Sequence, residues 1–222
     1  LEEHQVAGLL LFAATRHLEH YVASRGPQSP PMVAVGSPLD FSGPIVRADD
    51  QIGGHEATRY LFSLGHRRVA FLGPRGRMAV GSRQVGYVNA MEEAGLEPWF
   101  LETNASVEAA ASAVAEIMVQ PDAPTGLVGF NDHTALGALR ALAELGISVP
   151  GQVSVTGFDN LELGACCLPA LTTVDLCTSE VARLAVERVL TMTEDEAGKL
   201  APEWTTVPPR LVVRESTGPL SP

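Results

Sequence analysis

Short apolar runs bounded by glycine, proline or aspartate alternate along the chain with stretches whose apolar residues recur at three- and four-residue spacing. Short apolar runs are typical of buried strands, and the longer spacing is typical of amphipathic helices. Their alternation predicts an α/β protein built from repeated β-α units around parallel sheets. The predicted strands are 6–12, 32–35, 45–48, 68–72, 99–101, 125–130, 153–158, 171–174 and 211–213.

Helices are expected between these strands, and glycine marks the end of several of them. Gly65, Gly95 and Gly146 each stand where a periodic segment stops, as expected for residues that terminate helices. Residues 193–201 are acidic and are expected to form an exposed linker, while the chain after Asp159 is expected to loop. The predicted helices are 14–24, 53–64, 83–94, 106–119, 132–145 and 179–191.

The strands fall into two groups, before and after about Gly73, and each group is expected to form a three-layer α/β lobe. We assign 1–73 to an N-terminal lobe, 74–174 to a C-terminal lobe, and 175–222 to a crossing segment followed by a helix and strand that complete the lobes. Two lobes imply a cleft. Ligands collect at the carboxyl ends of parallel strands, so the cleft is the expected binding site.

Composition narrows the class of protein. The 222 residues are 45% hydrophobic, which is enough for a sizeable core, and the net charge is -11 with scattered basic side chains. Direct DNA binding by these residues is therefore not expected. No apolar run is long enough for a membrane helix. The three cysteines are odd in number, and the adjacent Cys166 and Cys167 cannot easily form an unstrained disulfide, so a reducing compartment is favoured and the cytoplasm is the expected location.

Enzyme and metal signatures are missing from the sequence. It contains no G-x-S-x-G elbow, no phosphate loop of the G-x-x-x-x-G-K-[ST] type and no H-E-x-x-H, so we expect neither an enzyme nor a cofactor. Gly73 to Gly76 is glycine-rich, but a plain turn explains it. His17 and His20 could share a metal on one helix face; without Cys or carboxylate ligands beside them, solvated surface histidines are favoured.

Polar residues that directly follow apolar strands are more informative. Asp132 is expected to cap a helix beginning at His133, although a wet cleft would also accommodate it. Asn160 could cap the next segment, which would leave Asp159 free to accept hydrogen bonds from ligand hydroxyls. Arg83 lies near a helix start, where a cation opposes the macrodipole. That placement indicates either ligand binding or a surface salt bridge.

At this point the residues resemble a known family. The stretch 64–73 (LGHRRVAFLG) is similar to the L-G-H-[RK]-[RK]-[IV]-A-x-[IL]-G segment of lactose-repressor/galactose-repressor (LacI/GalR) transcription regulators. Other segments match in the family's order over essentially the whole chain: 48–54 (ADDQIGG), 130–137 (FNDHTALG), 153–160 (VSVTGFDN), 169–174 (PALTTV) and 211–217 (LVVREST).

The resemblance implies a periplasmic-binding-protein-like fold, with two α/β lobes around a ligand cleft, and a homodimer. Carried over by position, Arg83, Asp159 and Asn131 fall on ligand-binding positions, and Asn104 falls where many members place an aromatic ring. Arg83 and Asp159 are expected to reach the cleft from opposite lobes. The segment 165–169 matches the dimer contact, which places Cys167 and Leu168 near the two-fold axis.

The resemblance also implies a function. The expected role is a sensor of a sugar or similar small metabolite in a transcriptional repressor, with ligand binding controlling operator affinity allosterically. A complete member would begin with a DNA-binding head and further β-α units, so we expect a longer natural protein and an incomplete first lobe here; operator DNA is contacted only through that head. The alternative is an extracytoplasmic sugar-binding protein of a transporter, against which the segments 64–73 and 211–217 favour the regulator.

Overall fold

The computed structural model describes residues 6–12, 29–36, 41, 43–74, 82–194 and 204–220. The chain forms two compact units. Unit 1 comprises Leu1–Ala48 and Cys177–Val207, and unit 2 comprises Asp49–Leu176 and Pro208–Pro222. The division thus falls after Ala48 and not at Gly73, because the helix and strand that follow Ala48 pack and pair within unit 2. The predicted helix 14–24 and most of the linker 193–201 lie outside the described residues.

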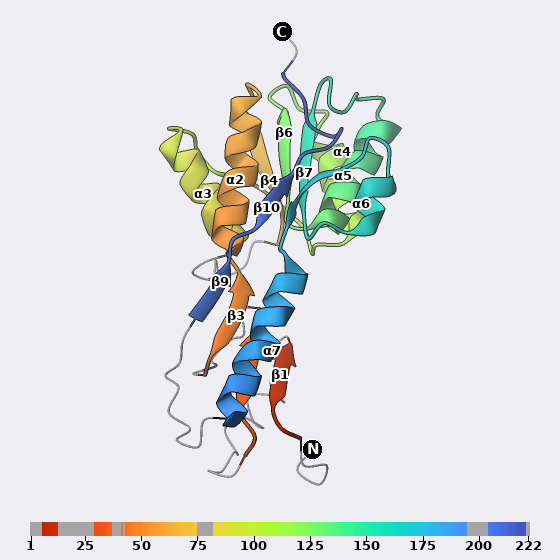
Figure 1. Ribbon diagram of the computed structural model, residues 1–222. Helices are drawn as coiled ribbons and strands as arrows, with labels where there is room; N and C mark the ends of the chain where they lie inside the picture. The colour runs from red at the N-terminus through yellow and green to blue at the C-terminus, as the bar shows by residue number, and fades with distance from the viewer. Residues whose placement is uncertain are drawn as a thin grey trace. The chain divides into compact units, whose positions relative to one another are not determined.

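Unit 1 is built on a parallel four-stranded sheet with the order β1-β2-β3-β9 (Figure 1). Helix α7 (Thr178–Glu194) covers one face of this sheet, where its side chains at 181, 185 and 189 pack against Val33 and Val46. This four-residue spacing belongs to the helical periodicity from which the helix was predicted. The strands are β1 (Leu9–Phe12), β2 (Met32–Val35), β3 (Ile45–Ala48) and β9 (Trp204–Val207).

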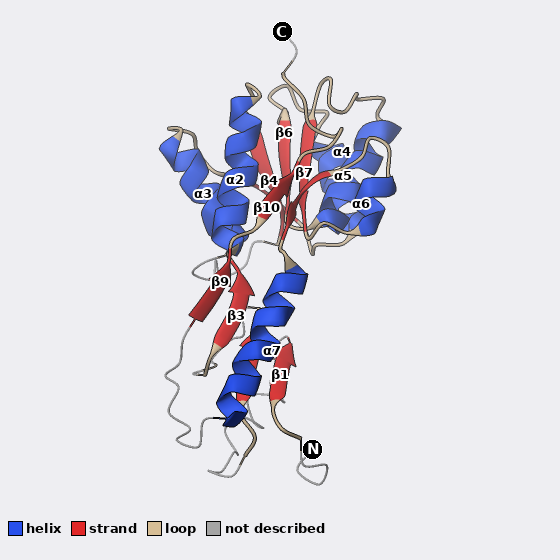
Figure 2. Ribbon diagram, in the orientation of Figure 1, coloured by secondary structure: helices blue, strands red, loops and turns tan. Residues whose placement is uncertain are grey.

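Unit 2 has three layers around a six-stranded sheet of order β10-β8-β7-β6-β4-β5. The pairs are parallel except that of β10 with β8. Helices α2 (Asp50–Ser63) and α3 (Arg83–Glu93) cover one side of this sheet, and α4 (Val107–Ile117) and α5 (Asp132–Glu144) cover the other (Figure 2). The strands are β4 (Val69–Gly73), β5 (Trp99–Glu102), β6 (Gly126–Gly129), β7 (Ser154–Phe158), β8 (Thr172–Asp175) and β10 (Arg210–Val212).

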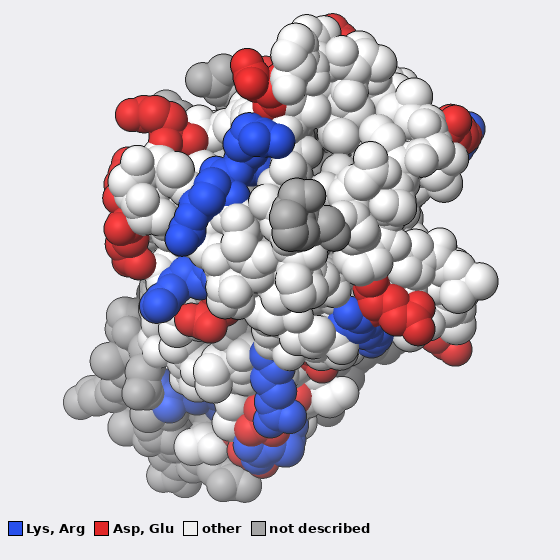
Figure 3. All heavy atoms as spheres, turned by 90° about the horizontal axis from the view of Figure 1, so that it is seen from above, with Lys and Arg blue, Asp and Glu red and all other residues white. Residues whose placement is uncertain are grey.

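On the face seen in Figure 3, uncharged residues cover most of the area, while several basic side chains lie in a short diagonal row and acidic side chains lie mainly toward the margins. Among the described helices, none is both long and apolar enough to cross a membrane.

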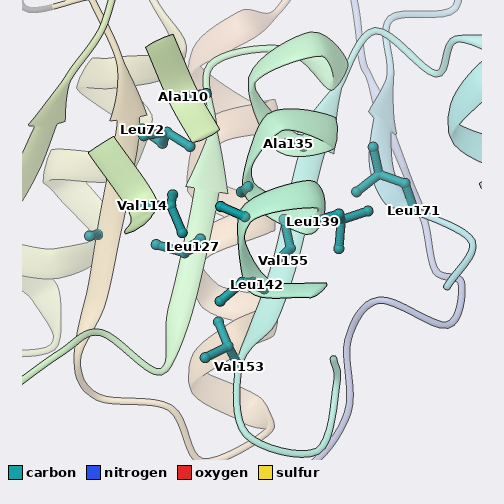
Figure 4. Close-up of a cluster of buried hydrophobic side chains, with 13 residues drawn as sticks. Leu72, Ala110, Val114, Leu127, Ala135, Leu139, Leu142, Val153, Val155 and Leu171 are labelled. Atoms are coloured by element: carbon teal, nitrogen blue, oxygen red, sulfur yellow. The ribbon is translucent and has the colours of Figure 1, made fainter. Parts of the chain in front are cut away.

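The core of unit 2 follows from the alternation of side chains along its strands. In β4, Val69 and Phe71 point toward α2 and α3, while Ala70 and Leu72 point toward α4 and α5. Figure 4 shows the hydrophobic cluster on the side of α4 and α5, where Leu72 and Leu127 from the sheet contact side chains of these two helices. Strands buried on both faces read as continuous apolar runs, which explains the pattern of the sequence.

Two of the segments that carry the family resemblance meet in unit 2. His66 is fully buried and donates from Nε2 to the carbonyl oxygen of Gly218 at 3.1 Å, while Nδ1 lies 3.2 Å from the Thr125 hydroxyl. Burial lowers the pKa of His66. Ser216 donates to the carbonyl of Val155 at 2.6 Å. The C-terminal segment is therefore hydrogen-bonded both to the 64–73 segment, through His66, and to β7, through Ser216.

The structure adds two elements that the hydrophobic pattern did not predict. Strand β9 has two exposed residues among its four and no continuous apolar run, so the hydrophobic pattern did not indicate it; it forms by pairing with the remote strand β3. Helix α6 (Glu162–Cys166) forms where a loop was expected, and it is a single short turn of helix without a side-chain cap.

Candidate functional site

Arg83 is the first residue of α3 and its side chain is only 12% exposed. Its Nη1 donates to the carbonyl oxygen of Phe130 at 2.6 Å and lies 3.4 Å from Asp159 Oδ1. Its Nη2 donates to Asp50 Oδ2 at 3.1 Å. The two carboxylates offset the unfavourable position of a cation at a helix start. Arg83 therefore forms salt bridges, although its side chain is largely buried and these are not the surface salt bridge considered from the sequence. Its part in ligand binding stays a prediction.

Close packing of α2 against α3 brings Asp50 to Arg83. A side chain at Gly54 would collide with the backbone of Arg83, and one at Gly86 would collide with the backbone of Gln51. The first turns of the two helices can approach this closely only because both positions are glycine. Asp50 was not among the predicted site residues, and its place beside Arg83 depends on this helix contact.

Two aromatic rings enclose the Arg83 guanidinium. Its Cζ atom lies 3.8 Å from the centroid of the Phe158 ring and 4.9 Å from that of Phe130. Both are cation-π contacts that hold the planar group in one orientation. Both rings stand at or just after the carboxyl end of a buried strand. The sequence reasoning missed them, although each immediately precedes a polar residue that it did identify.

Asp159 follows β7 in an unusual backbone conformation. Its φ is 107° and that of Asn160 is 54°, in the left-handed region that residues other than glycine rarely adopt. Burial raises the pKa of the Asp159 carboxyl, and Arg83 opposes the increase. Asn160 does not cap the next helix as expected. Its side chain donates to Asp175 at 3.3 Å and accepts from Arg214 at 2.7 Å.

The pair of Arg83 and Asp159 retains unused hydrogen-bonding capacity. Of the five N–H groups of a guanidinium, Nε–H and one Nη2–H have no acceptor among the described residues, and Asp159 Oδ2 has no donor there. The Asp159 side chain is 31% exposed. These groups lie beyond the carboxyl ends of β4, β6 and β7, the edge at which parallel sheets bind ligands. Chemically, the arrangement can both donate to and accept from a ligand.

Asp132 has a different role from the one expected. The helix begins at Asp132 itself, with Asn131 as the N-cap, so Asp132 is not the cap. Its side chain is fully buried, accepts from the backbone N–H of Leu161 at 2.7 Å and accepts from the Thr173 hydroxyl at 2.6 Å. Burial raises the pKa of this carboxyl, and the hydrogen bond from Thr173 opposes the increase.

The two other predicted ligand contacts are engaged locally. Asn131 Oδ1 accepts from the backbone N–H of Thr134 at 2.9 Å, as an N-cap side chain does. Asn104 is exposed, and its Oδ1 accepts from the backbone N–H of Ser106 at 3.1 Å. Neither side chain is hydrogen-bonded to Arg83 or Asp159. Their roles in ligand binding stay predictions.

All four predicted ligand residues belong to unit 2. The expectation that Arg83 and Asp159 extend from opposite lobes is therefore wrong. The boundary between the lobes was predicted at Gly73, whereas the division falls after Ala48. Strands β4 and β7, which precede Arg83 and Asp159, therefore belong to the same sheet.

The predicted dimer segment exposes apolar surface. Leu168 is 91% exposed and Leu163 is 60% exposed, whereas the Cys167 thiol is partly buried and donates to the carbonyls of Gly164 and Pro169. Within the described part of the chain, no group of His, Cys, Asp and Glu side chains is arranged to hold a metal ion. His17 and His20 lie outside that part.

Comparison with known proteins gives the same family from sequence and from structure. Residues 58–217 match the model of the periplasmic binding protein-like domain. The HTH-type transcriptional regulator DegA of Bacillus subtilis (strain 168) is 37% identical over 182 residues, which cover 80% of this chain and 53% of DegA. The HTH-type transcriptional repressor PurR of Vibrio vulnificus (strain CMCP6) is 32% identical over 223 residues, covering 97% of this chain and 66% of PurR.

The comparison with solved structures leads to the same family as the comparison of sequences. A LacI family transcriptional regulator from Enterococcus faecium with bound ribose has a TM-score of 0.83 and 26% identity, covering 99% of this chain and 82% of that one. A transcription regulator from Lactobacillus plantarum has a TM-score of 0.87 and 25% identity, covering 98% and 84%. This chain spans about half the length of DegA and just under two thirds of PurR. It belongs to the periplasmic-binding-protein-like family and, within it, to the effector-binding domains of LacI-family transcription regulators.

Proposed function

We propose that this domain binds a small, neutral, hydroxyl-rich effector, a sugar or similar metabolite, through Arg83 and Asp159. The observation that carries the proposal is the hydrogen-bonding capacity that the described residues leave unused in this partly buried pair: donors on a guanidinium held between two rings, and an acceptor oxygen on the neighbouring carboxylate. A hydroxyl group both donates and accepts, so a polyol satisfies both residues. The ribose bound to the Enterococcus faecium regulator supports this ligand class.

Charge favours a neutral ligand over an anionic one. Arg83 already has two carboxylates beside it, Asp50 and Asp159, so the three groups together carry a net negative charge when all are ionised. A phosphate or carboxylate ligand that accepted from the remaining N–H groups of Arg83 would meet both carboxylates, Asp50 and Asp159, at close range. A sugar hydroxyl adds hydrogen bonds without that repulsion.

We infer further that the complete protein is a cytoplasmic repressor in which effector binding alters the affinity of a separate DNA-binding head for its operator. The relatives named as HTH-type regulators support this role, and the three free cysteines suit a reducing compartment. Such coupling requires the effector to favour one of two conformations, by about 1–3 kcal/mol in typical cases. The domain then acts by binding and not by turnover.

The effector can be found by thermal shift, with ribose first and then other sugars, nucleosides and sugar phosphates. A ligand at a hundred times its dissociation constant adds about 2.7 kcal/mol to stability. Calorimetry on R83A and D159A should then show affinity losses of about ten- to 150-fold, which corresponds to the loss of a hydrogen bond to a charged group. R140A, which removes an exposed salt bridge elsewhere, is the control. Unchanged affinity in both site variants would refute the proposed site.

We also propose a homodimer in which Cys167 and Leu168 of the 165–169 segment lie near the two-fold axis. Leu163 and Leu168 together present an apolar surface that association would remove from water. In sedimentation, L168E should be more monomeric than the wild type, because dimerisation of the variant would bury an unpaired charge. V119E, which alters another exposed apolar residue, should not. A wild-type protein that stays monomeric at high concentration would contradict the proposal.

A further inference from the structure

Three consecutive backbone N–H groups follow β7, and each has a fixed acceptor on another element. The acceptors belong to β8 and to the first turn of α5, so the turn is held from two directions. The hydrogen bonds are Asp159 N to Val174 O at 2.9 Å, Asn160 N to Thr173 Oγ1 at 3.3 Å, and Leu161 N to Asp132 Oδ2 at 2.7 Å.

The Thr173 hydroxyl connects these contacts. It accepts from the N–H of Asn160 and donates to Asp132 Oδ1 at 2.6 Å, so that Thr173 and Asp132 hold adjacent residues of the turn and also each other. Both side chains are fully buried. The neighbouring strand makes room for the carboxylate, because any side chain at Gly157 would collide with Asp132 Oδ1.

The turn needs such support because of its backbone. Asp159 and Asn160 both have positive φ, which disfavours residues with a Cβ atom. Conformations of this kind persist only where the surroundings over-determine them. The direction of the Asp159 side chain, toward Arg83, depends on this backbone conformation.

We propose that Thr173 and Asp132 are positioning residues for the effector contact: their hydroxyl and carboxylate hold the 159–161 turn in the conformation that directs Asp159 toward Arg83. The inference rests on the proposed function of Asp159 in ligand binding. Thr173 itself is fully buried and hydrogen-bonded to the turn and to Asp132. Its effect on affinity is exerted through Asp159.

The test compares variants of Thr173 in the full chain. T173V keeps the shape of the side chain and removes the hydroxyl, whereas T173S keeps the hydroxyl. T156V is the matched control, because Thr156 is equally buried in the adjacent strand and its hydroxyl bonds to the carbonyl of Leu127. If T173V does not fold, T173A removes the same hydroxyl without adding a methyl group beside Asp132.

The first measurement needs no ligand. Amide hydrogen exchange followed by NMR should be about tenfold faster at Asn160 and Leu161 in T173V, and close to wild type in T173S and T156V. Equal exchange at both amides in T173V and T156V would overturn the proposal. Because this readout is independent of any effector, the failure of the inference can be distinguished from failure of the proposed function.

The second measurement uses ribose as the probe. T173V should weaken ribose binding by about tenfold, T173S should restore it, and T173V should cost little more affinity once Asp159 has been changed to Ala. Fully additive losses in the double variant would show that Thr173 does not act through Asp159. Absence of ribose binding in the wild type would count against the proposed ligand, and the exchange experiment alone would then decide the inference.

Discussion

The β6–α5 turn at Asn131 and Asp132 and the β7–α6 turn at Asp159 and Asn160 look alike in sequence but differ in what their side chains do. Each is a pair of polar residues that follows a buried strand. At the first turn, both carboxylate oxygens of Asp132 and the amide oxygen of Asn131 accept hydrogen bonds from the protein. At the second, Asp159 Oδ2 has no donor among the described residues.

This comparison shows how a structural carboxylate can be distinguished from one that is available to a ligand. Burial raises the pKa of both Asp132 and Asp159, so a perturbed pKa does not separate them. Hydrogen-bond satisfaction does separate them. A buried polar group with its partners in place belongs to the fold, and one with unused capacity at the edge of a sheet suits a ligand.

The largest effect is expected from D132A. Removing this carboxylate leaves two buried donors, the Leu161 N–H and the Thr173 hydroxyl, without their acceptor, at a cost of about 1–3 kcal/mol each. The free energy of unfolding, measured with urea, should fall by about 3 kcal/mol. D159A is the comparison and should lose less than about 1 kcal/mol, since its ion pair is partly exposed. Equal losses in the two variants would contradict the distinction between the turns.

A smaller effect is expected from N131A. Loss of the N-cap of α5 should reduce the free energy of unfolding by about 1 kcal/mol, and N131S should recover most of it because serine caps as well as asparagine. Effector affinity, measured by calorimetry, should change little in N131A if the cap is the main role of this side chain. A large loss of affinity with unchanged stability would instead place Asn131 in the binding site, as the family resemblance implies.

The smallest effect on stability is expected from D159G, about 0.5 kcal/mol or less in either direction. Relief of the positive φ, about 1–2 kcal/mol, is offset by the backbone entropy of glycine and by the lost ion pair. A loss above about 2 kcal/mol in urea unfolding would show that Asp159, like Asp132, is mainly structural.

The same variant tests the pH dependence. Burial raises the pKa of Asp159 above the ordinary aspartate value of 3.8. At a pH between the pKa of the unfolded chain and the higher pKa of the native state, the native carboxyl keeps a proton that the unfolded chain has released. The contribution of this group to the free energy of unfolding is therefore complete below pH 3.8 and is lost as the pH rises through the native pKa. D159G lacks the group, and its stability should therefore decrease less than that of the wild type from about pH 4 to about pH 7. If the stability of D159G and that of the wild type changed equally with pH over this range, the raised pKa of Asp159 would be contradicted.

Much of the fold was determined by the sequence alone. Buried parallel strands appear as apolar runs such as 68–72 and 153–158, and their carboxyl ends identify Asp159 without any structure. Arg83 was identified by its unfavourable place at a helix start, a local property. These inferences succeed because hydrophobic periodicity and helix electrostatics depend on residues close together in the chain.

The tertiary structure decided how these local features combine. Unit 2 begins at Asp49 because α2 and β4 pack with later elements, and strand β9 exists because it pairs with β3. Asp50 and the rings of Phe130 and Phe158 reach Arg83 from other elements. Asp132 supports the next turn and does not cap its own helix, since the donors that satisfy it, at Leu161 and Thr173, follow in later parts of the chain. Burial makes such remote partners necessary, and only the folded chain brings them within hydrogen-bonding distance.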